Sequence, residues 1–374
     1  MRSSNHRDLT LDILKGLGCL LMIMAHMPYR AGVYRQLTFL GGFATVPFYA
    51  VAGVTATFQA QKYAPRAVTL NYLILFLLGF ALNGFNSPDY LRPPVIHFDI
   101  IQIIALGSLC VYLLEYYLKP AAWVYLLLAL LTFLAKLGLD ILLPVQDHPA
   151  LAGILLPYSG TFPLIPWLFL FFLGAYAYRL GNWWNLGWAL LLLGTYWTLV
   201  WSGLDLHYRS KYDMSVGYFL LSCMLLFVLY LCARGMALLR DSAGLAPLTF
   251  LGRNSLLFLF VHFAAIAFFY LRLQWNENIP LFRATPFLFW LFLLVIVLIV
   301  MSGLLRVAGF LLLESYFDRI WVWAVLIALV LGVAAVIPHN GLVRWVESGL
   351  GIVAALYYHR LGRALKSVKA MTTT

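Results

Sequence analysis

The chain has 374 residues, of which 63% belong to the hydrophobic set AVILMFWYC and only 10% are charged. A soluble domain is about 45–50% apolar with about a quarter of its residues charged, so this composition excludes a water-soluble globule and requires lipid as the solvent for much of the surface. The 25 basic residues exceed the 14 acidic ones, which gives a net charge of +11. In a membrane protein that excess indicates cytoplasmic loops and anionic lipid headgroups, and we expect no nucleic-acid partner.

Apolar runs of about 20 residues, enough for a helix to cross a bilayer, recur along the chain. They predict spans over 9–29, 38–58, 67–85, 97–118, 121–143, 162–180, 183–202, 214–234, 248–272, 286–310 and 320–338, with a weaker twelfth segment at 342–358. The runs are too long for barrel strands. We therefore predict an all-α fold: one polytopic transmembrane helical bundle over 1–374, with about 11 (10–12) spanning helices and a short basic tail from about 359.

The distribution of Lys and Arg predicts a cytoplasmic N-terminus, because that orientation puts the larger share of basic residues on the cytoplasmic side. If the segment 342–358 lies on the membrane surface instead of crossing, there are eleven spans and the tail moves to the far side. We expect a bacterial inner (plasma) membrane as the location.

The first predicted span carries three ionisable residues, Asp12, Lys15 and His26. Placing such residues inside a membrane costs free energy, so their presence there suggests a function. At 100° per residue Lys15 and His26 lie about 20° apart on the helix face, and the rise separates them by roughly 16 Å. One interpretation is an Asp12–Lys15 ion pair with a histidine at headgroup level. The other is a buried polar stripe with a cation at the cytoplasmic end and an imidazole near the outer end.

Four other residues are candidates for the site. His97 and Asp99 precede the fourth span, where they either form an acid–base pair with His26 or cap the start of a helix. His262 lies on an apolar helix, which is more typical of a hydrogen-bonding core residue than of a catalyst. Arg253 opens a span and stands out among the cytoplasmic cations. No pair of histidines has metal-ligand spacing and no carboxylate cluster is present, so we predict no metal.

Three segments give the chain a family resemblance. Residues 11–16 (LDILKG) followed by His26 match a basic-x10-His pattern, residues 162–167 (FPLIPW) are followed by Gly174, and residues 251–256 (LGRNSL) precede His262. With a weaker likeness at 97–102 (HFDIIQ), the sequence resembles the transmembrane acyltransferase superfamily. That group includes bacterial glycan O-acyltransferases and the lysosomal heparan-α-glucosaminide N-acetyltransferase. Many members that modify polysaccharides carry Arg-x-x-Arg in the first cytoplasmic loop, whereas this chain has Lys62-x3-Arg66.

The resemblance implies transfer of an acyl group, usually acetyl, from cytoplasmic acyl-coenzyme A to a glycan or amino-sugar acceptor at the outer side. Under that assignment Lys15, Arg66 and Arg253 would hold the donor phosphates. His26 would act as general base or accept the acyl group itself, with His97 or Asp99 orienting it. Acetyl-coenzyme A would be the donor substrate, and membrane lipids would surround the protein.

Two other classes remain open. A transporter or a lipid or glycan flippase also uses buried polar residues and broken helices, although no internal repeat is visible. A structural scaffold would explain the spans but not Lys15 and His26 on one face. The sequence leaves open the acceptor, O- versus N-acylation, the acyl chain length and the oligomeric state, for which a homodimer is one alternative.

Overall fold

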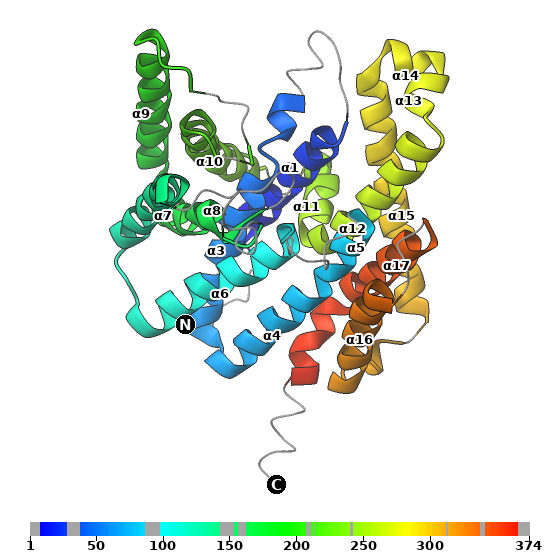
Figure 1. Ribbon diagram of the computed structural model, residues 1–374. Coiled ribbons are helices and arrows are strands. Elements are labelled where there is room, and N and C mark those ends of the chain that lie inside the picture. The colour runs from blue at the N-terminus through cyan, green and yellow to red at the C-terminus, as the bar shows by residue number, and fades with distance from the viewer. Residues whose placement is uncertain are drawn as a thin grey trace.

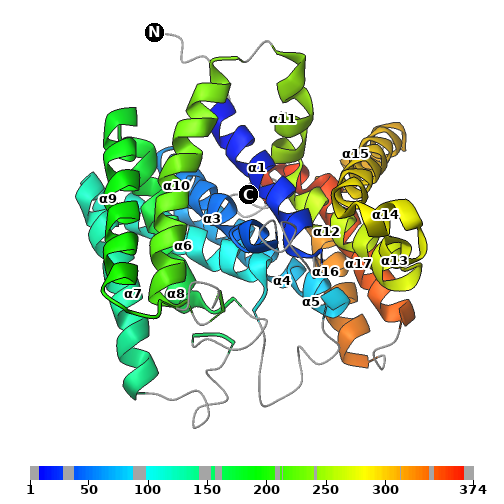
Figure 2. The ribbon, with the colours of Figure 1, turned by 90° about the horizontal axis from the view of Figure 1, so that it is seen from above.

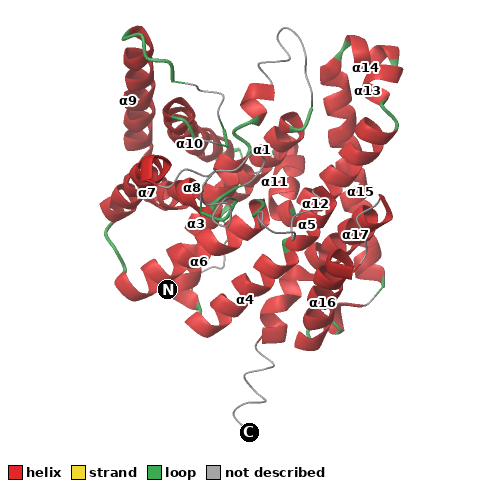
Figure 3. Ribbon diagram, in the orientation of Figure 1, coloured by secondary structure: helices red, strands yellow, loops and turns green. Residues whose placement is uncertain are grey.

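The computed structural model describes residues 8–27, 38–86, 98–142, 153–155, 162–206, 211–212, 214–239, 242–311, 313–336 and 341–365. Within these ranges every regular element is helical (Figure 3). This confirms the all-α prediction. The elements in chain order are α1 (Leu9–Ala25), α3 (Thr45–Lys62), α4 (Pro65–Leu78), α5 (Phe80–Asn86), α6 (Ile100–Leu118), α7 (Ala122–Leu142), α8 (Leu164–Arg179), α9 (Asn182–Trp201), α10 (Val216–Ala237), α11 (Ala246–Arg253), α12 (Ser255–Ala265), the π-helix η3 (Ile266–Arg272), α13 (Trp275–Asn278), α14 (Pro280–Ala284), α15 (Pro286–Phe310), α16 (Ile320–Val336) and α17 (Gly341–Tyr357).

The protein is an integral membrane protein. In the part of the chain that the structure describes, seven helices are long and apolar enough to cross a bilayer: Thr38–Lys62, Pro65–Phe85, Ile100–Leu118, Ala122–Leu142, Val216–Ala237, Ser255–Arg272 and Pro286–Phe310. Several of them expose large apolar side chains, such as Leu134 on α7 and Ile299 on α15. That surface suits lipid and not water. The other predicted spans are also helical, and the number that cross stays a prediction.

Helix α1 lies in the middle of the bundle (Figures 1 and 2). It packs against α3, α10, α11 and α12. In both views α7 and α9 lie on one side of it, and α13, α14 and α15 lie on the other. A central helix is the element best placed to hold polar side chains away from lipid, because every face of it meets protein.

Glycines bring the central helices into backbone contact. A Cβ atom at Gly16 of α1 would lie 2.2 Å from the carbonyl oxygen of Leu248, and one at Gly252 of α11 would lie 1.8 Å from that of Asp12. Close approach through small residues is a usual means of helix association in lipid, where apolar surface by itself gives no preference for protein over lipid. Gly252 belongs to the 251–256 segment, so part of this motif serves packing.

The 162–167 segment and Gly174 also serve packing. Trp167 is completely buried at the start of α8, where its ring makes an edge contact with Tyr49 at 5.7 Å between centroids. A Cβ at Gly174 would lie 2.4 Å from the Cα of Ala50 on α3. These two residues hold α8 against α3, which is itself a neighbour of α1.

Of the predicted span 248–272, the part Ser255–Arg272 is long and apolar enough to cross a bilayer, and the residues before it belong to a separate helix. The helix breaks at Asn254, whose φ of −111° and ψ of 29° are not helical, and the last turns form the π-helix η3. The break separates α11, which meets α1 through Gly252, from α12. Because α12 starts in a new direction, it can bring His262 to the other end of α1. The first helix is also shorter than the predicted 9–29, since α1 ends at Ala25.

Candidate active site

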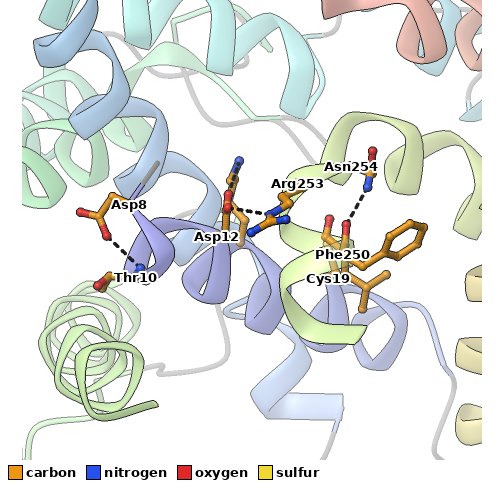
Figure 4. A network of polar contacts seen from close by, with 9 residues as sticks. Asp8, Thr10, Asp12, Cys19, Phe250, Arg253 and Asn254 are labelled. Carbon is orange, nitrogen blue, oxygen red and sulfur yellow. Dashed lines mark hydrogen bonds and ion pairs between the residues drawn. The ribbon is translucent and has the colours of Figure 1, made fainter. Parts of the chain in front are cut away.

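The N-terminal half of α1 carries a three-residue ion cluster, of which Figure 4 labels Asp12 and Arg253. The Nζ of Lys15 lies 3.8 Å from Oδ1 of Asp12, and the Nε of Arg253 lies 3.2 Å from Oδ2 of the same carboxylate. The Asp12 side chain is 3% exposed, Lys15 23% and Arg253 52%. The predicted Asp12–Lys15 pair is confirmed. The second pair, to Arg253, was not predicted, because the two residues are 241 positions apart.

This cluster, Asp12–Lys15–Arg253, has two cations around one carboxylate and so a formal charge of +1. The carboxylate is buried while both cations reach toward solvent. Arg253 is the most exposed of the three, and its guanidinium offers five donors in a fixed plane. The cluster can therefore present cationic hydrogen-bond donors to an anionic group while Asp12 fixes their position.

Arg66 lies on a different helix, in the exposed first turn of α4. Its neighbour Ala67 lines a pocket of about 410 Å³ between the α3–α4 turn and the C-terminal end of the described chain. Tyr63, Tyr358 and Arg363 line the same pocket. The hydroxyl of Tyr358 accepts a hydrogen bond from Asn71 at 3.1 Å, which joins α4 to the C-terminal segment. The pocket thus combines aromatic faces with cations at its edge.

His26 follows α1 directly and caps its C-terminal end, where its backbone N–H donates to the carbonyl of Ile23 at 3.3 Å. The ring is partly buried. It lies 4.6 Å from the ring of Phe263 and 5.7 Å from the ring of His262, both on α12. The imidazole is therefore placed by two elements, the end of α1 and one face of α12.

His262 is completely buried, and its Nδ1 lies 2.9 Å from the carbonyl oxygen of Phe258. The expectation of a hydrogen-bonding core residue is correct for that nitrogen. The Nε2 atom, in contrast, is buried without a hydrogen-bond partner among the described residues. The 251–256 segment marks His262 in the sequence, but nothing in the sequence places it beside His26.

Asp99 is the N-cap of α6. Its carboxylate accepts hydrogen bonds from the backbone N–H of Ile100, at 2.6 Å, and from that of Gln102. The side chain of Gln102 in turn accepts one from the N–H of Asp99, which completes a capping box. The structure thus confirms the capping interpretation of Asp99. His97 lies outside the described residues, so its predicted role stays a prediction.

Lys211, in the loop before α10, was not singled out from the sequence. Its ammonium lies 5.0 Å from the centre of the Phe162 ring and interacts electrostatically with both Asp99 and His26. Burial lowers the pKa of Lys211 to about 8, and the negative charge of Asp99 opposes this shift. Asp99 is therefore connected to His26 through the Lys211 charge.

Metal chemistry has no support in the described ranges, which contain no group of three or more His, Cys, Asp and Glu side chains placed to hold a metal ion. The prediction that the reaction uses no metal stays a prediction.

Comparison with known families adds one finding. Residues 7–185, just under half of the chain, match the family described as "Heparan-alpha-glucosaminide N-acetyltransferase, catalytic". Among curated proteins and among solved structures, nothing matches the chain. The matched region includes Lys15, His26, Arg66 and Asp99, whereas Arg253 and His262 follow it.

Proposed function

Residues 7–185 belong to the transmembrane acyltransferase family, and from that premise we propose that this membrane enzyme of the acetyltransferase type moves an acetyl group from cytoplasmic acetyl-coenzyme A to a glycan or amino-sugar acceptor at the outer face of a bacterial inner membrane. The observation that carries the proposal is that the two ends of α1 bear different functional groups. It has a cationic cluster in its first turns and an imidazole at its far end, and it lies in the middle of the bundle.

The donor end would be cytoplasmic and electrostatic. Lys15 and Arg253 would bind donor phosphates, because phosphate oxygens accept short charge-assisted hydrogen bonds from ammonium and guanidinium groups. Arg66 lies next to the pocket beside Tyr63 and Arg363, which suits a nucleotide head: aromatic rings can stack on a base and arginines can pair with phosphates. The pantetheine arm would then extend along the bundle toward His26.

The acyl end would use His26 as the catalytic residue. In direct transfer, the acceptor oxygen or nitrogen bonds to the acyl carbon, the C–S bond breaks, and the acceptor proton passes to His26 and from there to the departing thiolate. In the two-step alternative, a His26 nitrogen bonds to the acyl carbon as the C–S bond breaks and the coenzyme A thiolate departs. The acceptor oxygen or nitrogen then bonds to the acyl carbon as its bond to His26 breaks, and the acceptor proton passes to the thiolate. Both routes end with free coenzyme A and acylated acceptor.

Asp99 and His97 would support that site from the fourth predicted span. For Asp99 the support is indirect, through its attraction for Lys211. A cation held near His26 could stabilise the negative charge that develops on the acyl carbonyl oxygen in either route.

The test is to incubate the purified protein with acetyl-coenzyme A carrying a radiolabelled acetyl group and a set of amino sugars and glycans. Wild-type protein should release coenzyme A and label an acceptor, while His26→Ala should lose at least about 10²-fold in turnover, the scale of general acid–base catalysis. Coenzyme A affinity and melting temperature should stay near those of the wild type. Undiminished transfer by His26→Ala would reject the catalytic role, and a wild-type protein that neither labels nor hydrolyses the donor would favour a transporter or flippase.

A further inference from the structure

The two ring nitrogens of His262 have opposite hydrogen-bonding roles. The carbonyl oxygen of Phe258 can only accept a hydrogen bond, so Nδ1, 2.9 Å away, must carry the hydrogen. In the neutral ring Nε2 is then a bare acceptor. Buried acceptors almost always have a partner, yet this one has none within the described residues. The nitrogen is therefore able to receive a hydrogen bond that none of the described residues supplies.

The His262 ring is held in one orientation. It stacks on Phe258 with 4.6 Å between ring centroids and 3° between planes, and Phe263 packs against it at 4.3 Å. The residue is completely buried on α12, which packs against α1, α15 and α17. A side chain fixed in this way can orient a neighbour without itself reaching the substrate.

The neighbour is His26. The two rings lie 5.7 Å apart at 43°, slightly farther than a direct hydrogen bond between two imidazoles requires. Catalytic hydrogen bonds are often long before substrate binds and tighten in the complex. A small movement of His26, which follows the last residue of α1 and is not inside a helix, closes the gap.

We propose that His262 is the positioning residue of His26: its Nε2 accepts a hydrogen bond from one N–H of His26, which leaves the other His26 nitrogen unprotonated and free for the acyl acceptor. This inference rests on the proposed function of His26. It gives His26 the support that an oriented second group supplies in other imidazole-based sites, namely a fixed tautomer and a stabilised imidazolium.

The proton balance is complete without any further reactant. The acceptor proton moves to the free nitrogen of His26 as the new bond to the acyl carbon forms and the C–S bond breaks. The thiolate then takes that proton. The hydrogen between His26 and His262 stays on His26 throughout, so His262 remains neutral and is not consumed.

Three variants of His262 separate this role from simple packing. His262→Phe keeps the stacked ring and removes both nitrogens. His262→Gln places a polar atom near the position of Nε2, and His262→Asn places one near Nδ1. We expect kcat to fall at least about tenfold in His262→Phe and His262→Asn and to be partly restored in His262→Gln. The affinity for coenzyme A should be unchanged in all three variants. The acidic limb of the pH profile should move to lower pH in His262→Phe, because this variant removes the acceptor that stabilises the His26 imidazolium. The Lys211 charge acts on His26 in wild type and variant alike, and Asp99 acts on Lys211.

A second readout does not depend on turnover. Diethyl pyrocarbonate modifies unprotonated imidazole nitrogens, and mass spectrometry can follow its rate at His26. His262→Phe and His262→Asn should slow this modification, and His262→Gln should slow it less. Equal kcat, pH profile and modification rate in all three variants would overturn the inference. If the wild type transfers no acetyl group but the modification rates follow the expected order, the proposed function fails and the His26–His262 pair stands.

Discussion

Gly252 of α11 lies so close to Asp12 of α1 that an added Cβ atom would come within 1.8 Å of the Asp12 carbonyl oxygen. That oxygen belongs to the backbone of a central helix and cannot rotate away. The contact also sets the position of the next residue, Arg253, whose guanidinium bonds the Asp12 carboxylate. A backbone contact and an ion pair thus lie side by side at the crossing of α1 and α11.

Gly252→Ala should therefore destabilise the protein by at least about 2 kcal/mol, because overpacking against backbone forces the helices apart. The measurement is the melting temperature in detergent. The matched control is Gly194→Ala on α9, where an added Cβ meets nothing within 4 Å and alanine is the better helix former. An equal effect of the two substitutions would contradict the close approach of α1 and α11.

Removing the two cations around Asp12 should have a more than additive effect. Lys15→Ala or Arg253→Gln alone leaves one ion pair to the buried carboxylate, so each should lower the melting temperature only slightly. The double variant removes both of these pairs and should cost several kcal/mol, since breaking a buried ion pair by removing one partner typically costs about 3–5 kcal/mol. Adding Asp12→Asn to the double variant should recover part of that loss. Simple additivity of the two single effects would show that Asp12 does not couple them.

Arg66→Glu should weaken coenzyme A binding at least about tenfold, because a cation beside the phosphates becomes a repelling charge. The same exchange at Arg363, which itself lines the pocket, should have a similar effect. Arg306→Glu, at an exposed position of α15, is the control for altered net charge. Isothermal titration in detergent measures all three. Unchanged affinity in the Arg66 and Arg363 variants would place the donor elsewhere.

Lys211 should make stability depend on pH in a defined direction. Its pKa is about 8 in the folded protein, lowered by burial, while an unfolded lysine titrates near 10.4. Between these values the unfolded chain binds more protons, so this residue makes stability rise with pH from about 8 to about 10.4. Below pH 8 both states carry the charge and the contribution is constant. The difference in melting temperature between the wild type and Lys211→Met should therefore change in favour of the wild type as the pH rises across this window. If the two melting temperatures depend on pH in the same way, the Lys211 ammonium is not desolvated in the folded protein.

The sequence by itself determined the class of the protein and its local pairs. Its apolar content and the length of its apolar runs require a helical membrane protein, because a helix satisfies its own backbone in lipid and the runs are too long for barrel strands. The Asp12–Lys15 pair and the capping interpretation of Asp99 could also be predicted from the sequence. Residues three positions apart on a helix are neighbours, and an Asp before a helix start caps it whatever surrounds it.

Only the tertiary structure decided which distant residues meet. Arg253 reaches Asp12 across 241 positions, and His262 comes to His26 from another helix. Helical periodicity fixes the face that a side chain occupies but not the helix that covers the face. That choice follows from the packing of whole helices, here from glycines that admit backbone contact and from the break at Asn254 that redirects α12. For this reason both ends of α1 could be identified as polar from the sequence, while their partners could not.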